Sequence, residues 1–181
     1  MSNTPILNNI RIIVAHDRCR GIGKNGGIPW NIPEDLKRFR HITNGNIVVM
    51  GRKTYESLPP KFRPLPNRFN IIMSSVATTT NTTSDTYPNL FYCNSVDSVK
   101  KQIKSIWDTH GRKDVDIIGG TEIYKQWFND VSILEVTEVD GEHNCDREFP
   151  FYKDCFERVW ESQWYPQGFR YSRWLRKDAS L

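Results

Sequence analysis

The sequence contains few cysteines and places none of them in a recognisable pattern. The four are Cys19, Cys93, Cys145 and Cys155, and their spacing matches neither a zinc site nor a disulfide framework. Isolated thiols of this kind are typical of proteins from reducing compartments. The sequence therefore predicts no metal site and favours a cytoplasmic protein.

Long apolar runs are also absent. No stretch is long enough to cross a membrane, so we expect no membrane association. The polar residues 1–9 lack the apolar core of a signal peptide, and we expect them to form a flexible extension.

Charge of one sign is not concentrated anywhere in the chain. The 181 residues carry a formal net charge of +4, with 25% charged and 38% hydrophobic residues, the balance of a globular domain. The densest basic groups, at 37–38, 52–53 and 173–177, are short. This distribution argues against a nucleic-acid surface and fits small anionic ligands better. Because internal repeats and long linkers are absent too, we expect one domain over residues 1–181.

A glycine-rich loop at residues 21–27 matches the letters of a dinucleotide-binding fingerprint. It follows an apolar strand expected at 10–16 and fits G-x-G-x-x-G. In that fingerprint a helix opens at once, and an acidic residue follows about 20 residues later. Here Pro29 and Pro33 delay the helix, and residues 41–46 contain no acid. We therefore reject a Rossmann unit and interpret the segment as a mobile loop.

A carboxylate stands in an unusual place just beyond this loop. Pro33 suits the first turn of a helix, which we predict over 33–43. Asp35 then shares a face with Leu36 and Phe39, although a surface helix normally keeps its acids on the opposite face. An acid against apolar walls has a raised pKa and can handle a proton or anchor a polar ligand. The alternative is an ordinary acid favoured by the dipole at a helix N-terminus.

A second candidate site follows a strand expected at 46–50. Gly51-Arg52-Lys53-Thr54 leads into a short helix expected to run through Leu58, so two cations and a hydroxyl stand at its start. Backbone N–H groups at a helix start attract anions, and the side chains add charge. The pattern predicts a phosphate site, with a solvated basic turn as the alternative.

The remaining pattern alternates strands with helices and closes on strands. A stop at Asn44-Gly45 ends the first helix, and Ser95 can cap a later one. We expect strands at 68–73, 90–93, 115–118 and 133–139, helices at 95–107 and 121–128, a surface loop at 77–89, and a hairpin of 156–164 and 169–176 around a turn at 165–168. This order predicts an α/β protein with a mixed sheet flanked by helices.

Several short segments together resemble dihydrofolate reductase, from about residue 10 to residue 175. They are Gly21-Ile22-Gly23, Pro29-Trp30, the helix with Asp35 and Phe39, residues 50–57, Arg63-Pro64-Leu65 with Arg68, Ile118-Gly119-Gly120 with Tyr124, Thr137, and Asp146 before Phe149-Pro150. Each segment is weak evidence alone, but their shared order and spacing are highly specific. The resemblance implies a mainly parallel central sheet with a C-terminal antiparallel hairpin, flanked by about four helices.

The resemblance also implies a reaction, the NADPH-dependent reduction of 7,8-dihydrofolate to 5,6,7,8-tetrahydrofolate, which supports one-carbon metabolism and thymidylate synthesis. Hydride passes from nicotinamide C4 to pterin C6 while N5 takes a proton, and the protein supplies placement and electrostatics. Asp35 corresponds to the one ionisable side chain of the pterin pocket and would assist this protonation through water. Thr137 would hydrogen-bond its carboxylate, and Trp30 would position a water. Monomer is the family default.

On the substrate side, Arg68 would bind the α-carboxylate of the glutamate tail as a bidentate pair. Read without the family, Arg68 is a cation at a loop end and most of the other residues are core. The full substrate set implied by the resemblance is Ile13, Val14, Asp35, Leu36, Phe39, Leu58, Leu65, Arg68, Ile118 and Thr137.

On the cofactor side, Arg52, Lys53 and Thr54 would hold the 2′-phosphate that distinguishes NADPH from NADH. Gly119 and Gly120 would be joined by a cis peptide that faces the cofactor. Ser75 is a departure, because many relatives carry Arg there. The full cofactor set is Ala15, Ile22, Gly23, Gly51, Arg52, Lys53, Thr54, Met73, Ser74, Ser75, Gly119, Gly120, Thr121, Glu122, Ile123 and Tyr124.

Two other functions stay open as alternatives. A pyrimidine reductase of riboflavin synthesis would share the fold and NADPH, but would not be expected to keep Trp30, Asp35 and Arg68 together. A binding protein without activity would lose Asp35 or gain a basic stripe with exposed aromatics, and the cations at 170–177 instead alternate like the solvent face of a hairpin. We expect no second domain after Trp174, although descent from a fusion with thymidylate synthase stays open.

Two further expectations concern loops and histidines. Asp146 would steady the glycine-rich loop from across the site, a gating role that can limit turnover in such enzymes. The adjacent Gly26 and Gly27 leave that loop unusually free of side chains. No partner pattern surrounds the four histidines, which we expect to be structural or on the surface: His16, His41, His110 and His143.

Overall fold

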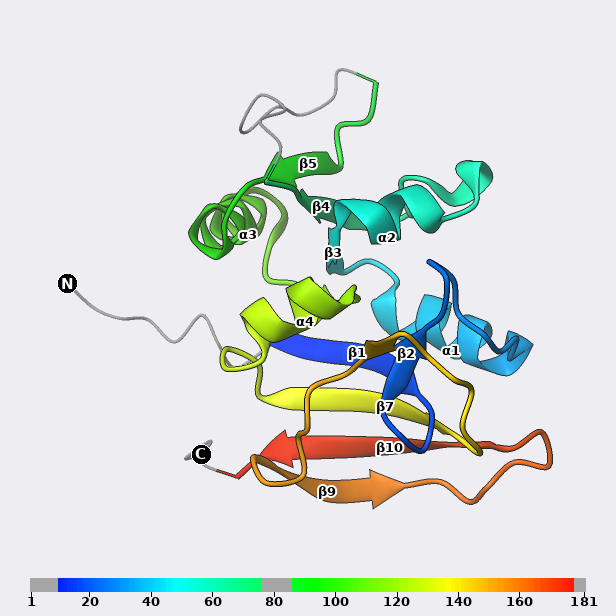
Figure 1. The fold of residues 1–181 in the computed structure, drawn as a ribbon. Helices are drawn as coiled ribbons and strands as arrows, with labels where there is room; N and C mark the ends of the chain where they lie inside the picture. The colour runs from blue at the N-terminus through cyan, green and yellow to red at the C-terminus, as the bar shows by residue number, and fades with distance from the viewer. Residues whose placement is uncertain (1–9, 76–85, 178–181) are drawn as a thin grey trace.

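The computed structural model describes residues 10–75 and 86–177 (Figure 1). The extension expected at 1–9 and most of the loop expected at 77–89 lie outside the described residues. The described helices are α1 (Pro33–Thr43), α2 (Arg52–Ser57), α3 (Val96–His110) and α4 (Thr121–Trp127), with a 3₁₀ turn, η2 (Pro60–Phe62). The strands are β1 (Ile10–His16), β2 (Gly21–Gly23), β3 (Ile47–Gly51), β4 (Phe69–Met73), β5 (Leu90–Cys93), β6 (Val115–Ile117), β7 (Ile133–Val139), β8 (Arg147–Glu148), β9 (Phe156–Glu161) and β10 (Phe169–Arg176).

Eight of these strands form one sheet in the order β5-β4-β3-β6-β1-β7-β10-β9. β10 runs antiparallel to both β7 and β9, whereas every other neighbouring pair is parallel. The predicted α/β class, mainly parallel sheet, C-terminal hairpin and four helices are confirmed. The neighbouring strands β3 and β6 lie in the inner part of the sheet, and each is followed in the chain by a helix, α2 and α4, at its carboxyl end.

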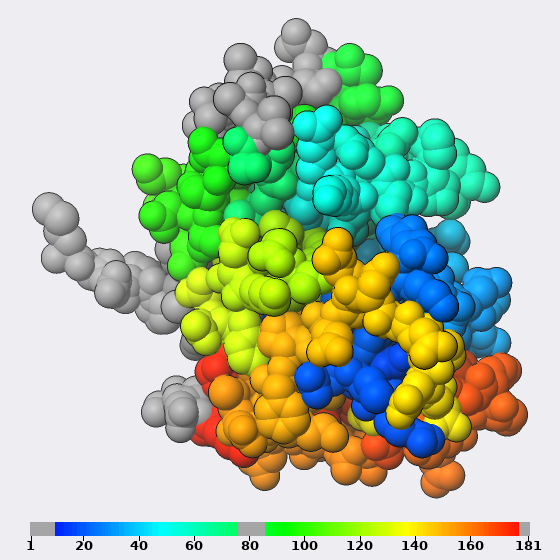
Figure 2. Space-filling view, viewed as in Figure 1, coloured from blue at the N-terminus to red at the C-terminus, as the bar shows by residue number. Residues whose placement is uncertain are grey.

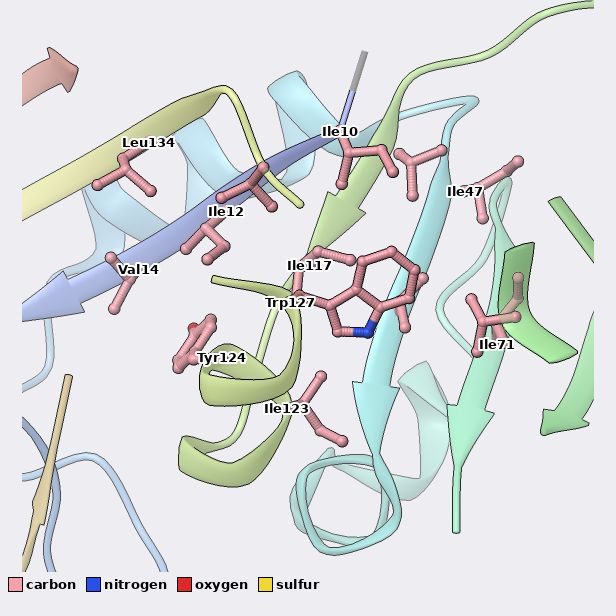
Figure 3. Close-up of a cluster of buried hydrophobic side chains, with 14 of the residues drawn as sticks. Ile10, Ile12, Val14, Ile47, Ile71, Ile117, Ile123, Tyr124, Trp127 and Leu134 are labelled. Carbon is pink, nitrogen blue, oxygen red and sulfur yellow. The ribbon is translucent and has the colours of Figure 1, made fainter. Parts of the chain in front are cut away.

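Alternate residues along β3 show how the two faces of the sheet are covered. Ile47 and Val49 belong to the main core cluster, which side chains of α3 and α4 complete on one face. Figure 3 shows Ile47 together with Ile123, Tyr124 and Trp127 of α4. Val48 and Met50 belong to a second cluster, which includes side chains of α1 and α2 on the other face. The period of two that defines a strand therefore places a helix pair against each face.

The chain pairs β2 with β8 in a separate two-stranded ribbon that the sequence did not predict. Gly21 belongs to a strand because backbones approach closely there: a Cβ at Gly21 would lie 2.6 Å from atoms of Cys145. Figure 2 shows the N-terminal segment (blue) and the segment around 140–150 (yellow to gold) side by side on one face of the molecule. The interpretation of 21–27 as a loop is therefore wrong for residues 21–23.

Other boundaries differ by a few residues from the expected ones. β9 ends at Glu161 rather than 164, because the Ser162 hydroxyl accepts the N–H of Tyr171 at 3.0 Å and diverts the chain. α3 continues to His110, where Gly111 ends it with a φ of 77°. The predicted cap at Ser95 and the stop at Asn44 and Gly45 are both confirmed.

All four cysteines are free thiols. In residues 10–75 and 86–177, no group of His, Cys, Asp and Glu side chains has the arrangement of a metal site. No helix within the same ranges is long and apolar enough to cross a membrane.

Candidate active site

The centre of the site is a hydrogen bond between α1 and β7. Pro33 opens α1, so Asp35 falls in its first turn, where the side chain points back toward the sheet. Thr137 on β7 donates its hydroxyl to Asp35 Oδ1 at 2.6 Å, and this threonine is 3% exposed. Burial raises the pKa of Asp35, while the Thr137 hydrogen bond and the charge of Arg38 act against that rise. The prediction that Asp35 is shielded from water and has a raised pKa agrees with the structure.

The second core cluster holds several of the predicted substrate residues. Phe39, Leu58, Leu65 and Ile118 all belong to that cluster, so the structure brings together most of the predicted substrate wall. Leu36 is 52% exposed, which makes it a rim residue rather than part of the packed wall.

The substrate residues on β1 divide between the two faces of the strand. Ile13 is half-buried on the face that continues to Ala15, and its carbonyl accepts the Tyr124 hydroxyl at 2.9 Å. Val14 points the other way into the main core (Figure 3), where it is 4% exposed. Strand alternation thus turns the Val14 side chain away from the face of Ile13 and Ala15, and its place in the substrate site stays a prediction.

Arg68 is a buried cation whose side chain is incompletely paired. It is 6% exposed, and its Nε has no hydrogen-bond partner among the described residues. Its guanidinium lies 5.9 Å from the ring centre of Phe39, and burial together with nearby Arg40 lowers its pKa. Asn89 donates to the Arg68 carbonyl at 2.7 Å and fixes its backbone. A buried guanidinium with free donors is suited to hold an anion.

The predicted phosphate site lies where β3 turns into α2. The first turn of α2 contains no acidic residue, and Arg52 and Lys53 are both exposed there. Arg52 donates from Nε to Glu56 one turn later at 2.7 Å, with both side chains about half exposed. The cation is therefore present at the expected place, but a carboxylate of the same helix competes for it.

A close approach of two backbones adjoins this turn. The Gly51 N–H donates to the Gly119 carbonyl at 2.8 Å, and the Gly119–Gly120 peptide is cis, as the resemblance implied. Gly119 has a φ of 119°, and a Cβ there would lie 3.3 Å from the Tyr124 hydroxyl. A Cβ at Gly120 would lie 3.3 Å from the Thr54 hydroxyl. The glycines therefore let the side chains of Tyr124 and Thr54 approach the backbone more closely than a side chain at either position would allow.

Other predicted cofactor residues take different positions. Met73 accepts the Trp127 indole N–H at its sulfur in the core, and Ile123 is 7% exposed. Both side chains are therefore largely buried, and their contact with the cofactor stays a prediction. Ser74, at the end of β4, and exposed Ser75 lie beyond Met73. Thr121 and Glu122 line a cavity of about 470 Å³ next to β8, while Ile22 and Gly23 stand on β2.

The glycine-rich segment is tied to the segment around 140–146. Asp146 accepts the N–H of Asn25 at 2.9 Å and donates its own N–H to Gly23, which confirms the expected contact across the site. Trp30 packs edge-on against His143, with ring centres 5.2 Å apart. His143 therefore contacts a predicted site residue, and the expectation that it is merely structural was incomplete.

Two groups near the site escaped the sequence analysis. Asp17 is 2% exposed, and although burial alone would raise its pKa, backbone N–H groups of His143, Gly21 and Cys19 lower it. The sequence feature that could have indicated Asp17 is its position between an apolar strand and a turn that contains glycine. Glu135 is also 2% exposed and binds two arginines, as described below. Its only sequence signal was an acid within an apolar strand.

The comparisons with known proteins agree with this geometry. A family model described as dihydrofolate reductase matches residues 9–168. The chain is 36% identical over 140 residues to dihydrofolate reductase HdrB of Haloferax volcanii, covering 77% of this chain and 69% of that protein. It is 36% identical over 127 residues to dihydrofolate reductase of Saccharomyces cerevisiae, covering 66% of this chain and 59% of that protein.

A second kind of relative is much longer. Bifunctional dihydrofolate reductase-thymidylate synthase 2 of Arabidopsis thaliana is 34% identical over 164 residues, which cover 83% of this chain. The match spans only 28% of that plant protein. The matched residues include both strands and helices of the site described above, and the chain belongs to the dihydrofolate reductase family.

Proposed function

We propose that the protein reduces 7,8-dihydrofolate to 5,6,7,8-tetrahydrofolate with NADPH, consuming one proton and releasing NADP⁺. The observation that carries the proposal is the partly buried Asp35 carboxylate, which accepts the Thr137 hydroxyl at 2.6 Å and has its pKa raised by burial. Membership of the family supports the same reaction. A pterin offers the adjacent amine and ring N–H donors that such a carboxylate can bind.

Asp35 would bind the 2-amino group and N3 of the pterin, with Thr137 holding the carboxylate in place. Because burial raises its pKa, Asp35 can take up a proton more readily than a surface acid. The carboxyl group would favour protonation of N5 through a water, which Trp30 would orient. These residues would thus control where the proton is held when the hydride arrives.

Arg68 would bind the α-carboxylate of the glutamate tail. The support is its burial and its unpaired Nε, since a buried donor without a partner costs free energy until a ligand satisfies it. The Phe39 ring beside it is available to contact the apolar part of the same tail.

NADPH would bind along the carboxyl end of β3 and the start of α4. Arg52, Lys53 and Thr54 would hold its 2′-phosphate, and Gly119 and Gly120 would let the cofactor approach the backbone. When bound, NADPH supplies the hydride for pterin C6. Tyr124 would keep this region rigid, because its hydroxyl is bonded to the Ile13 carbonyl at 2.9 Å.

A direct assay tests the proposal. Purified protein is mixed with NADPH and dihydrofolate, and the loss of NADPH absorbance and the formation of tetrahydrofolate are followed together. We expect one tetrahydrofolate for each NADPH consumed. Absence of turnover in a protein that is folded by circular dichroism would refute the proposal.

The remaining expectations stay predictions. We propose that the protein acts as a monomer in the cytoplasm, as a single domain and without a nucleic-acid partner. Sedimentation of the full chain with and without NADPH would test the oligomeric state.

A further inference from the structure

Three charged side chains beside the Asp35–Thr137 pair have no part in the function proposed above. Glu135 on β7 accepts Arg38 Nη2 of α1 at 2.7 Å and Arg173 Nε of β10 at 2.6 Å. The exposed fractions of the three side chains are 2% for Glu135, 19% for Arg38 and 52% for Arg173. Glu135 is therefore a buried carboxylate shared by an inner and an outer arginine.

The inner arginine lies on the same surface as Asp35. Arg38 follows Asp35 by three residues, so both point to one face of α1. The Arg38 guanidinium lies 4.5 Å from the ring centre of Tyr171 on β10, and Tyr171 is the register partner of Thr137. Glu135 precedes Thr137 by two residues on β7, which places both side chains on the α1 side of the sheet. Arg38 is thus ion-paired with Glu135 and lies one helical turn from Asp35 on the same face of α1.

We propose that Arg38 is a positioning residue whose charge, shared between Glu135 and Asp35, sets the protonation state of Asp35. Its relevance to catalysis rests on the proposed function. Burial favours the neutral form of Asp35, and Arg38 opposes that effect by stabilising the carboxylate. Glu135 holds Arg38 against β7 and offsets part of its charge. The balance between two opposite charges would therefore set the pH at which the site holds its proton.

The other charged or titratable groups facing Asp35 are few among the described residues. Tyr124 of α4 and Tyr171 of β10 both have their pKa raised, first by burial and then by the charge of Asp35; that of Tyr171 rises to about 12. Glu34 is next to Asp35 on α1, and Thr137 contributes only a hydroxyl. Since both tyrosines stay neutral at physiological pH, Arg38 and Glu135 are the charges that can tune Asp35 there.

The test measures Asp35 directly in the protein without ligand. Aspartate carboxyl carbons are labelled with ¹³C, the Asp35 signal is assigned from its loss in Asp35→Asn, and its pKa is read from an NMR pH titration. Arg38→Met should raise that pKa by about half a unit or more, because a cation near the carboxylate is lost. Arg38→Lys should restore most of the original value, since it keeps the charge. Glu135→Gln should shift the pKa in the opposite direction.

Arg173→Met is the matched control. It breaks the other ion pair of Glu135, at a side chain that is half exposed and belongs to β10 rather than to α1. We expect a clearly smaller shift at Asp35 than in Arg38→Met. Equal shifts in the two variants, or no shift in Arg38→Met, would overturn the proposal. If Glu135→Gln does not fold, the pKa of Asp35 in Arg38→Met, Arg38→Lys and Arg173→Met is sufficient to test the proposal.

A kinetic measurement separates this proposal from the proposed function. The pH dependence of dihydrofolate turnover should move with the NMR-derived pKa, in the same direction and by a similar amount. An NMR shift without a kinetic shift would support the role of Arg38 and contradict the role of Asp35 in catalysis. Absence of turnover in the unaltered protein would refute the function and leave the NMR result valid.

Discussion

The substrate side and the cofactor-phosphate side of the proposed site are built in different ways. On the substrate side, Asp35 and Thr137 are joined at 2.6 Å between packed elements, and Arg68 is 6% exposed. On the phosphate side, Arg52 is half exposed and bonded to Glu56 of its own helix. Buried charges interact strongly and in fixed geometry, whereas exposed ones are screened by water and salt. We infer that substitutions on the substrate side have larger effects, on turnover or on substrate binding, than substitutions on the phosphate side.

The largest effect should come from Asp35→Asn, which removes the ionisable group and keeps the shape. We expect turnover of dihydrofolate at neutral pH to fall by about 100-fold or more, the usual range for loss of acid–base assistance. At low pH the loss should be smaller, because solvent can protonate the substrate. Steady-state rates measured across the pH range check this prediction. A loss of equal size at every pH would contradict the role in protonation.

The next effect should come from Arg68→Leu. A charged hydrogen bond is worth about 1.5–3 kcal/mol, so the KM for dihydrofolate should rise roughly 10- to 100-fold. Arg40→Leu is the control, because Arg40 is a nearby but exposed cation. A substrate analogue without the glutamate tail should lose nothing in Arg68→Leu. Equal losses with both substrates would show that Arg68 has a structural role instead.

A smaller effect is expected on the phosphate side. Arg52→Ala should raise the KM for NADPH roughly tenfold, with little effect on that for NADH, and the difference should shrink at high salt. Glu56→Gln should lower the KM for NADPH slightly, because it releases Arg52 from its intrahelical partner. An equal rise in the KM for NADPH and for NADH in Arg52→Ala would show that Arg52 has a structural role. It would also contradict the inference that the phosphate side binds the 2′-phosphate through an exposed charge.

The smallest effect should be on stability, again at Asp35. Since its folded-state pKa is raised, the folded chain binds this proton more tightly than the unfolded chain does. The free energy of unfolding therefore falls as pH rises from the unfolded pKa through the folded one. Asp35→Asn should raise the Tm at neutral pH and leave it nearly unchanged below the unfolded pKa. A lower Tm at neutral pH would contradict this linkage.

The sequence predicted the strands that run through the core almost to the residue. β1, β5 and β7 were placed at their observed limits because continuous or alternating apolar runs set them. The β2–β8 ribbon was missed because its two short strands carry glycine and charged residues with no apolar period. Short strands of this kind are fixed by contacts between distant segments, which a local pattern does not contain.

The candidate site residues also divide into those that a local sequence pattern indicates and those that depend on contacts between distant segments. Asp35 was singled out because an acid is unusual on an apolar helix face, whereas Arg68 and Gly119 were named only through the family resemblance. For Val14 the resemblance gives a position along the strand, while alternation decides which way the side chain points. Arg38 was seen only as part of a basic group, since its partner Glu135 lies 97 residues away in sequence.

Asp17 joins two segments of the chain beside the candidate site, the one with Cys19 and Gly21 and the one with His143. One of its carboxylate oxygens accepts the N–H groups of Cys19 and Gly21, and the other accepts the N–H of His143. The two segments cannot separate without leaving a buried charge short of its donors, which is costly. They must therefore open as one cooperative unit, and the amide hydrogens of these three residues should exchange with solvent at a common rate.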